Sequence, residues 1–420
     1  EIGALCDFSS GYGFRARDWS EHGWPIIRIQ NLNGSREFNY FDGVPDPAWI
    51  VEPGQLLFAW AGTLGVSFGP VVWNGPRGVL NQHIYRIHPK PGIDKRWLHD
   101  ALLVVTARIE RKAHGFKSSL VHVHKSDITD QLVFTPTIAE QRAVADTLER
   151  WDHAIALTSR LIAAKQQLRR GLMQQLLTGK RRFPGFVQSV ETRETRWGSY
   201  PKDWAYRRIG AVASHVSTIN RNGQALPVLS CTKHRGLVDS LEYFGKQVYS
   251  KDLSTYKVVE RGQFAYATNH IEEGSIGYQD LHDQALISPM YTVFEADETV
   301  DDRFLFLVLK TELYRHIFEA NTSASVDRRG SLRWPEFARL HVPLPSLDEQ
   351  RAIVGAFEIV DRKLTLLQSQ LTALQTQKRG LMQQLLTGKV RVPLPADAAD
   401  GAEHMDSART ADSPAAQIGA

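Results

Sequence analysis

One eleven-residue string occurs twice in this chain, and the repeat constrains the fold more than any other feature. The string occupies residues 170–180 and 379–389 and reads Arg-Gly-Leu-Met-Gln-Gln-Leu-Leu-Thr-Gly-Lys. At the same offset of 209 residues, the 41 positions of 140–180 align with 349–389, and 20 of them are identical. Such a repeat predicts two copies of one structural unit.

The repeated segment is predicted to be a long helix with a defined start. In each copy a proline precedes a Ser or Thr, and a glutamate follows three residues later. These residues are Pro136, Thr137 and Glu140 in the first copy and Pro345, Ser346 and Glu349 in the second. This is the spacing of a capping box, in which the hydroxyl accepts from the third helical N–H and the glutamate reaches back to the cap.

Apolar residues recur along each segment at steps of three and four, the spacing of a coiled-coil seam. In the second copy the seam is Ile353, Phe357, Val360, Leu364, Leu367, Leu371, Leu374, Lys378, Leu381 and Leu385. In the first copy it is Val144, Leu148, Trp151, Ile155, Thr158, Ile162, Lys165, Arg169, Leu172 and Leu176. A basic residue recurs at Arg169 and Lys378. It either fixes register or partner choice, or carries its charge out to water.

Length and composition predict a multi-domain globular protein. A chain of 420 residues is longer than one hydrophobic core usually supports, and 42% of its residues are hydrophobic. Cys6 and Cys231 lack metal-ligand spacing, which suits a reducing cytoplasm. No apolar run reaches the roughly 18 residues of a membrane span. The net charge is +4, and the 25 residues from Ala396 carry five acidic residues and one arginine. We expect this tail to be disordered, and the remaining excess of about +8 permits nucleic-acid binding.

Two blocks, residues 1–135 and 181–342, lie outside the repeated helices. Both contain short β-like runs separated by Gly and Pro, and they share landmarks in the same order. Residues 1–3 match 208–210, residues 51–55 match 259–263, and residues 82–87 match 288–293. The blocks are therefore predicted to be paralogous domains with a common fold and different surfaces.

With Pro-x-x-x-Glu-Gln at each helix start and Leu-Leu-Thr-Gly-Lys at each helix end, the chain resembles the specificity subunits of type I restriction–modification systems over essentially its whole length. The resemblance implies an α+β fold, with two paralogous mixed α/β target-recognition domains joined by two long antiparallel coiled-coil helices. The expected parts are 1–135 (domain 1), 136–180 (helix 1), 181–342 (domain 2 with its linker), 343–390 (helix 2) and 391–420 (disordered tail). Trp197, Pro201 and Trp204 precede the second domain, whereas the first begins at Glu1, so its N-terminal strand is expected to be truncated.

The resemblance also implies a function in the prokaryotic cytoplasm. Each domain would read one half of a bipartite double-stranded DNA target, and the helices would set the gap and dock two methyltransferase subunits, with restriction translocase subunits joining them. S-adenosylmethionine, ATP and Mg would belong to those partners, and this chain would bind no cofactor. The partner-binding helix residues are expected to be Leu148, Ile155, Ile162, Leu172, Phe357, Leu364, Leu367, Leu371, Leu374 and Leu381.

Catalytic signatures are missing from the sequence, which predicts a non-enzymatic chain. It has no Gly-x-x-x-x-Gly-Lys-Ser/Thr phosphate loop and no Asp/Asn-Pro-Pro-Tyr/Phe methyltransferase motif. His122 and His124 alternate and are predicted to share one face of a strand. Two histidines without a third ligand do not make a zinc site, so no metal is predicted.

DNA readout needs Lys or Arg for phosphates and Asn, Gln, Arg or Ser for base edges. In the first domain the candidates are Asn81, Gln82, His83, Lys117, Ser118, Ser119 and Lys125. In the second domain they are Lys233, His234, Arg235, Asn269, His270, Ser325, Arg328 and Arg329. For any single member the alternative is a solvated surface residue without a function.

Two other functions stay open from the sequence. One is a coiled-coil adaptor whose domains bind proteins, which a weak salt dependence of DNA affinity would indicate. The other is a cryptic nuclease or methyltransferase, which incubation of the lone chain with DNA, magnesium and S-adenosylmethionine would reveal.

Overall fold

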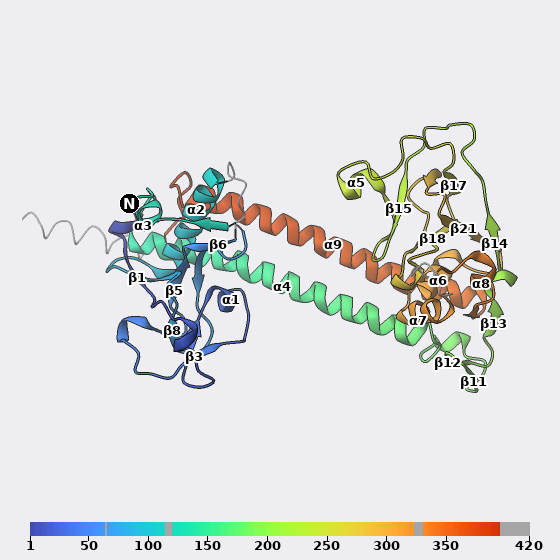
Figure 1. Ribbon diagram of the computed structural model, residues 1–420, viewed down its shortest axis with the longest axis horizontal. Helices are drawn as coiled ribbons and strands as arrows, with labels where there is room; N and C mark the ends of the chain where they lie inside the picture. The colour runs from blue at the N-terminus through green and yellow to red at the C-terminus, as the bar shows by residue number, and fades with distance from the viewer. Residues whose placement is uncertain (64, 114–119, 323–330, 395–420) are drawn as a thin grey trace, which may run out of the picture. The chain divides into compact units, whose positions relative to one another are not determined.

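The computed structural model describes residues 1–63, 65–113, 120–322 and 331–394, and they form two compact units (Figure 1). The first unit comprises residues 1–159 together with the chain from Ser369 onward, and the second comprises Arg160–Gln368. Each unit holds one mixed α/β domain, the start of one long helix and the end of the other. No helix in the described part of the chain is both long and apolar enough to cross a membrane.

A four-stranded antiparallel sheet forms the centre of the first unit. Its order is β1 (Cys6–Ser10), β9 (Ile84–Pro89), β5 (Leu56–Ala59) and β7 (Gly69–Val72). Helix α2 (Lys95–Ala113) covers this sheet, because its buried side chains Trp97, Leu98 and Leu102 share a core with Leu56 and Phe58. Burial of such large apolar side chains is the main source of the domain's stability.

The rest of the first domain is a second sheet with short additions. The sheet order is β3 (Asn39–Phe41), β2 (Trp24–Ile27), β8 (Gly78–Leu80) and β4 (Ile50–Val51), with β2 parallel to β8. A two-stranded ribbon pairs β6 (Ala61–Thr63) with β10 (Leu120–His122). The short helices are η1 (Ile2–Ala4), η2 (Ala16–Asp18), α1 (Ile29–Leu32), η3 (Pro47–Trp49) and α3 (Lys125–Thr129).

The second unit repeats the central sheet of the first. Its order is β14 (Ala213–Val216), β21 (Tyr291–Ala296), β18 (Phe264–Ala267) and β19 (Ile276–Tyr278), covered by α6 (Asp302–Leu309) and α7 (Glu312–Asn321). Four ribbons complete it: β11 (Thr192–Thr195) with β12 (Gly198–Pro201), β13 (Ala205–Arg208) with β22 (His341–Leu344), β15 (Leu229–Thr232) with β16 (Gly236–Asp239), and β17 (Lys257–Glu260) with β20 (Gln284–Ile287). Its short helices are η4 (Pro184–Phe186), η5 (Ile209–Ala211), α5 (Ser240–Phe244), η6 (Ile271–Glu273) and α8 (Trp334–Phe337).

The shared strand order confirms the predicted common fold of the two domains, and the strand pairing corrects one detail of their alignment. Cys6 pairs with Pro89 in the first sheet, and Ala213 pairs with Ala296 in the second. The offset is therefore 207 residues on both strands, whereas matching 82–87 with 288–293 uses 206. A slip of one residue exchanges the two faces of a strand, so the sequence match at this landmark was wrong by one position.

The two long helices are α4 (Ile138–Leu176) and α9 (Leu347–Leu385), each of 39 residues. Every predicted seam residue is buried or half-buried, whereas other apolar residues of the same helices, including Leu157, Ile359 and Leu366, are exposed. The seam prediction is confirmed, and it was the period rather than hydrophobicity alone that identified the buried face.

The predicted capping box forms only in part. Thr137 and Ser346 accept hydrogen bonds from Glu140 N–H at 3.4 Å and Glu349 N–H at 3.3 Å. The prediction that the glutamate side chain reaches back to the cap was wrong. In the first unit Arg391 donates to the Glu140 carboxylate, with Nη2–Oε2 at 2.5 Å. The sequence predicts that Arg391 belongs to the disordered tail, but it contacts the start of α4. The tail beyond residue 394 lies outside the described residues.

The second unit contains the equivalent contact with the copies exchanged. Arg182 donates to Glu349 at 2.8 and 2.7 Å and to Asp203 at 2.9 and 2.8 Å, and all three side chains are largely buried. Arg182 and Arg391 each follow a repeated Thr-Gly-Lys. In each unit, therefore, the end of one helix is fastened to the start of the other, and the two segments run antiparallel.

The glutamine after each glutamate fastens the globular domain to the helix. Gln141 is 1% exposed; its amide donates to Pro136 O at 2.9 Å and accepts from Asp94 N at 2.8 Å. Gln350 makes the equivalent bonds to Pro345 O at 3.0 Å and Asp301 N at 2.8 Å. Buried amides need such partners. In each Glu-Gln pair, therefore, the glutamate contacts the end of the opposite helix and the glutamine contacts the globular domain.

The two units differ where β13 pairs with β22 in the second. Residues 132–135 are the counterpart of β22 in the first unit, and they form no strand. Leu132 is 70% exposed there.

Candidate nucleic-acid interface

In the first domain, Gln82 and His83 lie on the turn between β8 and β9. The Gln82 carbonyl accepts from Trp60 Nε1 at 3.0 Å, and Asn81 N donates to Ile27 O at 3.0 Å. The Gln82 side chain is exposed, whereas Asn81 and His83 are half-buried. The turn is thus anchored through its backbone, and the exposed Gln82 amide can meet a base edge.

Aromatic and histidine rings extend from this turn across neighbouring strands. His83 lies 5.3 Å from Trp60 and 6.5 Å from His122, measured between ring centroids. Trp60 stacks on Tyr85 at 6.0 Å, and Tyr85 meets Phe8 edge-on at 5.7 Å. These partly exposed rings offer flat faces beside a hydrogen-bonding turn, and such a surface can take up sugar and base edges of a nucleic acid.

The pKa of His83 is lowered from its ordinary value, chiefly by burial and then by His122 and Arg28. His83 is therefore neutral at pH 7, with one ring nitrogen donating and the other accepting. A neutral imidazole can read a base edge, and an approaching anion such as a phosphate would favour its protonated form.

The other first-domain candidates have mixed outcomes. Lys125 begins α3, donates to Phe8 O at 3.3 Å and lies 5.8 Å from the Phe8 ring, so it reaches the same row of rings. Lys117, Ser118 and Ser119 lie outside the described residues. The prediction that His122 and His124 share a strand face was wrong, because β10 ends at His122 and His124 is the N-cap of α3.

In the second domain, Lys233, His234 and Arg235 form the exposed turn between β15 and β16. Lys310 supports this turn from below, since its Nζ donates to Lys233 O at 2.9 Å and Gly274 O at 2.8 Å. Burial lowers the pKa of Lys310. The turn borders a cleft of about 470 Å³ whose wall also includes Glu273, and several cations around it suit a phosphate.

Asn269 and His270 directly precede η6, and His270 is its N-cap. They line a second cleft of about 430 Å³ that also includes Glu273. His270 Nδ1 lies 3.4 Å from Glu273 Oε1. The structure thus brings two of the three predicted loops of this domain to neighbouring clefts, whereas Ser325, Arg328 and Arg329 lie outside the described residues.

Sequence reasoning missed Trp60, Tyr85 and Lys310. Trp60 lies in an apolar stretch that reads as a core strand, and Lys310 follows a buried helix. Only the three-dimensional structure identifies these two residues as part of the surface. Trp60 contacts the turn at Gln82, 22 residues away in the sequence, and Lys310 contacts the turn at Lys233, 77 residues away.

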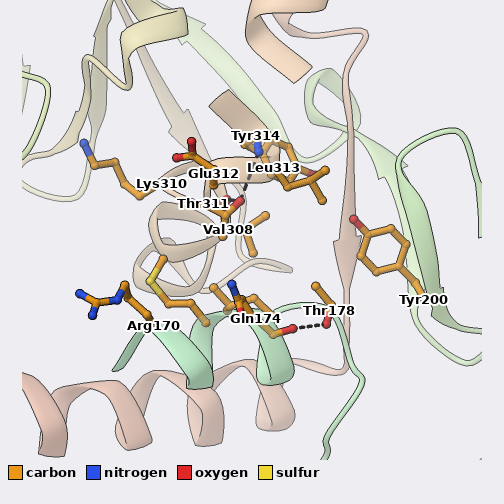
Figure 2. Close-up of a pocket in the computed structure, with 12 residues that line it drawn as sticks. Arg170, Gln174, Thr178, Tyr200, Val308, Lys310, Thr311, Glu312, Leu313 and Tyr314 are labelled. Carbon is orange, nitrogen blue, oxygen red and sulfur yellow. Dashed lines mark hydrogen bonds between the residues drawn. The ribbon is translucent and has the colours of Figure 1, made fainter. Parts of the chain in front are cut away.

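A different cavity, of about 420 Å³, lies at the end of α4 (Figure 2). Figure 2 shows Gln174 and Thr178 from the repeated string facing Val308 and Tyr314 of the α6–α7 region, with Arg170 and Lys310 at the edge. Its lining is mostly apolar, in contrast to the clefts beside the polar turns. It lies at the end of α4 and shares Lys310, Thr311 and Glu312 with the cleft beside the Lys233 turn.

The residues predicted to bind partners through the helices lie in the seam. Leu148, Ile162, Phe357, Leu364 and Leu367 are 9% exposed or less. The others, Ile155, Leu172, Leu371, Leu374 and Leu381, are half-buried. Within each unit these residues pack in the seam between the helices. Substituting one of them would therefore affect the binding of a partner indirectly, through the helix pair. Their role in binding a partner stays a prediction.

Sequence comparison identifies relatives of the whole architecture. The type I restriction modification DNA specificity domain matches residues 1–165 and again 201–376. The chain is 23% identical over 365 residues to the type I restriction enzyme MjaVIII specificity subunit of Methanocaldococcus jannaschii, covering 82% of this chain and 80% of that one. It is 21% identical over 388 residues to the EcoBI specificity subunit of Escherichia coli, covering 84% and 77%.

Solved structures share the fold. The S subunit of a type I restriction–modification system from M. genitalium aligns with a TM-score of 0.51 at 16% identity, over 92% of this chain and 94% of that one. A chain from a structural study of the assembly and conformational transition of the type I R-M system aligns with a TM-score of 0.56 at 14% identity, over 93% and 97%.

Proposed function

Because the chain belongs to the type I restriction–modification DNA specificity family, we propose that it is the DNA-reading subunit of such a complex and that each domain reads one half of a bipartite target. The observation that carries the proposal is the pairing of a common scaffold with different polar turns. The central sheets have the same strand order. Gln82 and His83 stand on one domain, and Lys233 and Arg235 on the other. A shared scaffold with divergent loops suits two readers of different sequences.

The helices would dock two copies of the methyltransferase subunit. Buried residues that are identical in the two repeats can be explained by packing, but exposed residues that are identical cannot. Leu157 and its counterpart Leu366 are identical, yet they are 48% and 59% exposed. Arg170, Gln174 and Gln175 are also exposed and repeated, at 379, 383 and 384. Two copies of one partner would impose the same residues on both helices. The comparisons give no support to a protein-binding adaptor without DNA specificity.

Catalysis would lie in the partner subunits. S-adenosylmethionine would serve the methyltransferase subunits, and ATP and Mg would serve the restriction subunits, so this chain would contribute recognition only. It would act in the prokaryotic cytoplasm, where its DNA target is. Incubating the lone chain with duplex DNA, magnesium and S-adenosylmethionine tests this division, and we expect neither cleavage nor methylation.

DNA recognition is tested by selecting bound fragments from a random duplex library, using the chain assembled with its methyltransferase subunits. We expect two constant half-sequences separated by a fixed gap. Affinity for the selected site should fall steeply with salt, because phosphate contacts release counterions. Recovery of no preferred sequence would contradict the proposal.

Docking is tested with Leu157→Asp and Leu366→Asp together. A carboxylate at each exposed position should weaken binding of the methyltransferase subunit while the chain stays folded, because neither side chain is in the core. The matched control is Leu168→Asp, on the same helix and 45% exposed, whose counterpart is Gln377. An equal loss of methyltransferase binding in the control, or undiminished binding in the double variant, would contradict docking at this surface.

A further inference from the structure

The basic residue that interrupts each seam forms an ion pair with the opposite helix. In the second unit, Arg169 of α4 meets Asp361 of α9 through two bonds, Nε–Oδ1 at 2.5 Å and Nη2–Oδ2 at 3.1 Å. The Arg169 guanidinium also lies 5.7 Å from the ring of the buried seam residue Phe357. A bidentate pair fixes the direction of approach as well as the distance.

The first unit contains the same pair with the helices exchanged. Lys378 of α9 donates to Asp152 of α4 at 2.5 Å. Both members are related by the 209-residue repeat, because Asp152 corresponds to Asp361 and Arg169 to Lys378. Asp152 is one of only 4 identical positions between residues 150 and 168. The pair therefore persists in a stretch where the two helices have otherwise diverged.

The position of the charges excludes the simpler explanation that the basic groups only reach water. The Lys378 side chain is 14% exposed and the Arg169 side chain 31%. Their heads contact carboxylates of the opposite helix instead. An ion pair within an apolar seam adds little net stability over apolar residues, but it specifies which residues face each other.

We propose that Arg169–Asp361 and Lys378–Asp152 act with the fastened helix ends to specify the register of the two helices and thereby the gap between the two half-sites. The inference rests on the proposed function, because the gap has meaning only if each domain reads one half-site. A slip of one helical turn would move the helices by about 5.4 Å and part each cation from its carboxylate. Since a base pair adds about 3.4 Å, one turn corresponds to one or two base pairs.

The test replaces both cations by an apolar side chain of similar length, Arg169→Met with Lys378→Met. The matched control is Arg160→Met with Lys363→Met, which removes two exposed cations from the same helices. Each chain is assembled with methyltransferase subunits, and bound fragments are selected from a random duplex library. We expect the Met variant to recover the same half-sequences with at least a tenfold larger share at a second gap, while the control keeps one gap. A single unchanged gap in the Met variant would overturn the proposal.

Register is also measured without DNA, from the distance between spin labels at Gln166 and Arg362, which are exposed on opposite helices of the second unit. The native cysteines are replaced by alanine for this purpose. We expect one narrow distance in the parent chain and a second population in the Met variant. A chain that carries the exchanged pair Arg169→Asp with Asp361→Arg, and keeps Lys378, should again show the single distance. One narrow distance in the Met variant would refute the register role, whereas a failure of all chains to select DNA would refute the proposed function alone.

Discussion

Replacing Arg182 by methionine should destabilise the second unit and leave the first unchanged. The Arg182 side chain is 7% exposed, and its partners Glu349 and Asp203 are 2% and 12% exposed. Trp204 Nε1 also donates to Glu349, at 3.2 Å. Methionine fills a similar length but leaves two carboxylates near each other, without a counter-charge, in a site that water reaches poorly.

The expected loss follows from the burial of the network. Removing one partner of a buried ion pair costs about 3–5 kcal/mol, because the remaining charge stays desolvated. Arg182 serves two carboxylates and the Phe186 carbonyl, at 2.7 Å, so we expect about 4 kcal/mol, near the middle of this range. That is a large part of the stability of a domain of this size.

Hydrogen exchange read by mass spectrometry distinguishes the two units, because peptides report each one separately. We expect faster exchange across Arg160–Gln368 and unchanged exchange in peptides of the first domain. The control Arg391→Met removes the repeat-related contact to Glu140. Because Arg391 is 63% exposed, its loss should be smaller and confined to the first unit. Equal acceleration in both units after Arg182→Met, or none, would refute the separate fastening of the units.

The remaining predictions concern pH, backbone and recognition. Burial and then the neighbouring Asp301 raise the pKa of Asp302 from 3.8 to about 6. The unfolded chain therefore releases this proton first, so stability falls as the pH rises from about 4 to about 6, and the full cost remains above pH 6. Asp302→Asn should stabilise the second unit by about 1 kcal/mol at pH 7.5 and not at pH 4, measured by urea unfolding. Gly179→Ala should lower the melting temperature, because φ is +68° and the new Cβ would lie 2.4 Å from Pro201. Grafting another domain over residues 200–342 should change one half of the selected DNA sequence only. The pKa of His83 is lowered and a bound phosphate would raise it, so DNA affinity should increase as the pH is lowered from neutrality and protonation becomes easier. His83→Gln should reduce that increase in anisotropy titrations.

The long helices could be predicted because their signals are local. The cap residue, the seam period and the glycine that ends each helix all lie within one segment, and the seam of α9 is buried or half-buried as expected. The partner of Glu140 could not be predicted, because Arg391 lies 251 residues away and nothing in the local sequence favours it over the helix cap. In both copies the glutamate accepts from a distant arginine instead of the cap.

The candidate nucleic-acid surface was predictable by residue type but not by arrangement. Polar residues between apolar runs indicated the turns at Gln82 and at Lys233. Their surroundings depend on which strands pair, and β6 pairs with β10 across more than fifty residues. That pairing brings His122 beside Trp60 and His83, a grouping that sequence spacing cannot reveal.

The distribution of identity between the repeats follows from how the units are built. Each unit joins the start of one helix to the end of the other, so every helix end must fit a helix start from the other copy. Leu176 and Leu177 are buried in the second unit as Leu385 and Leu386 are in the first, and a change in one end would meet only the opposite start. Ends and starts therefore resist divergence, while the domains beyond them are free to change what they read. Exposed identities such as Leu157 and Leu366 are not explained by this exchange, whereas the proposed docking of two copies of one subunit would account for them.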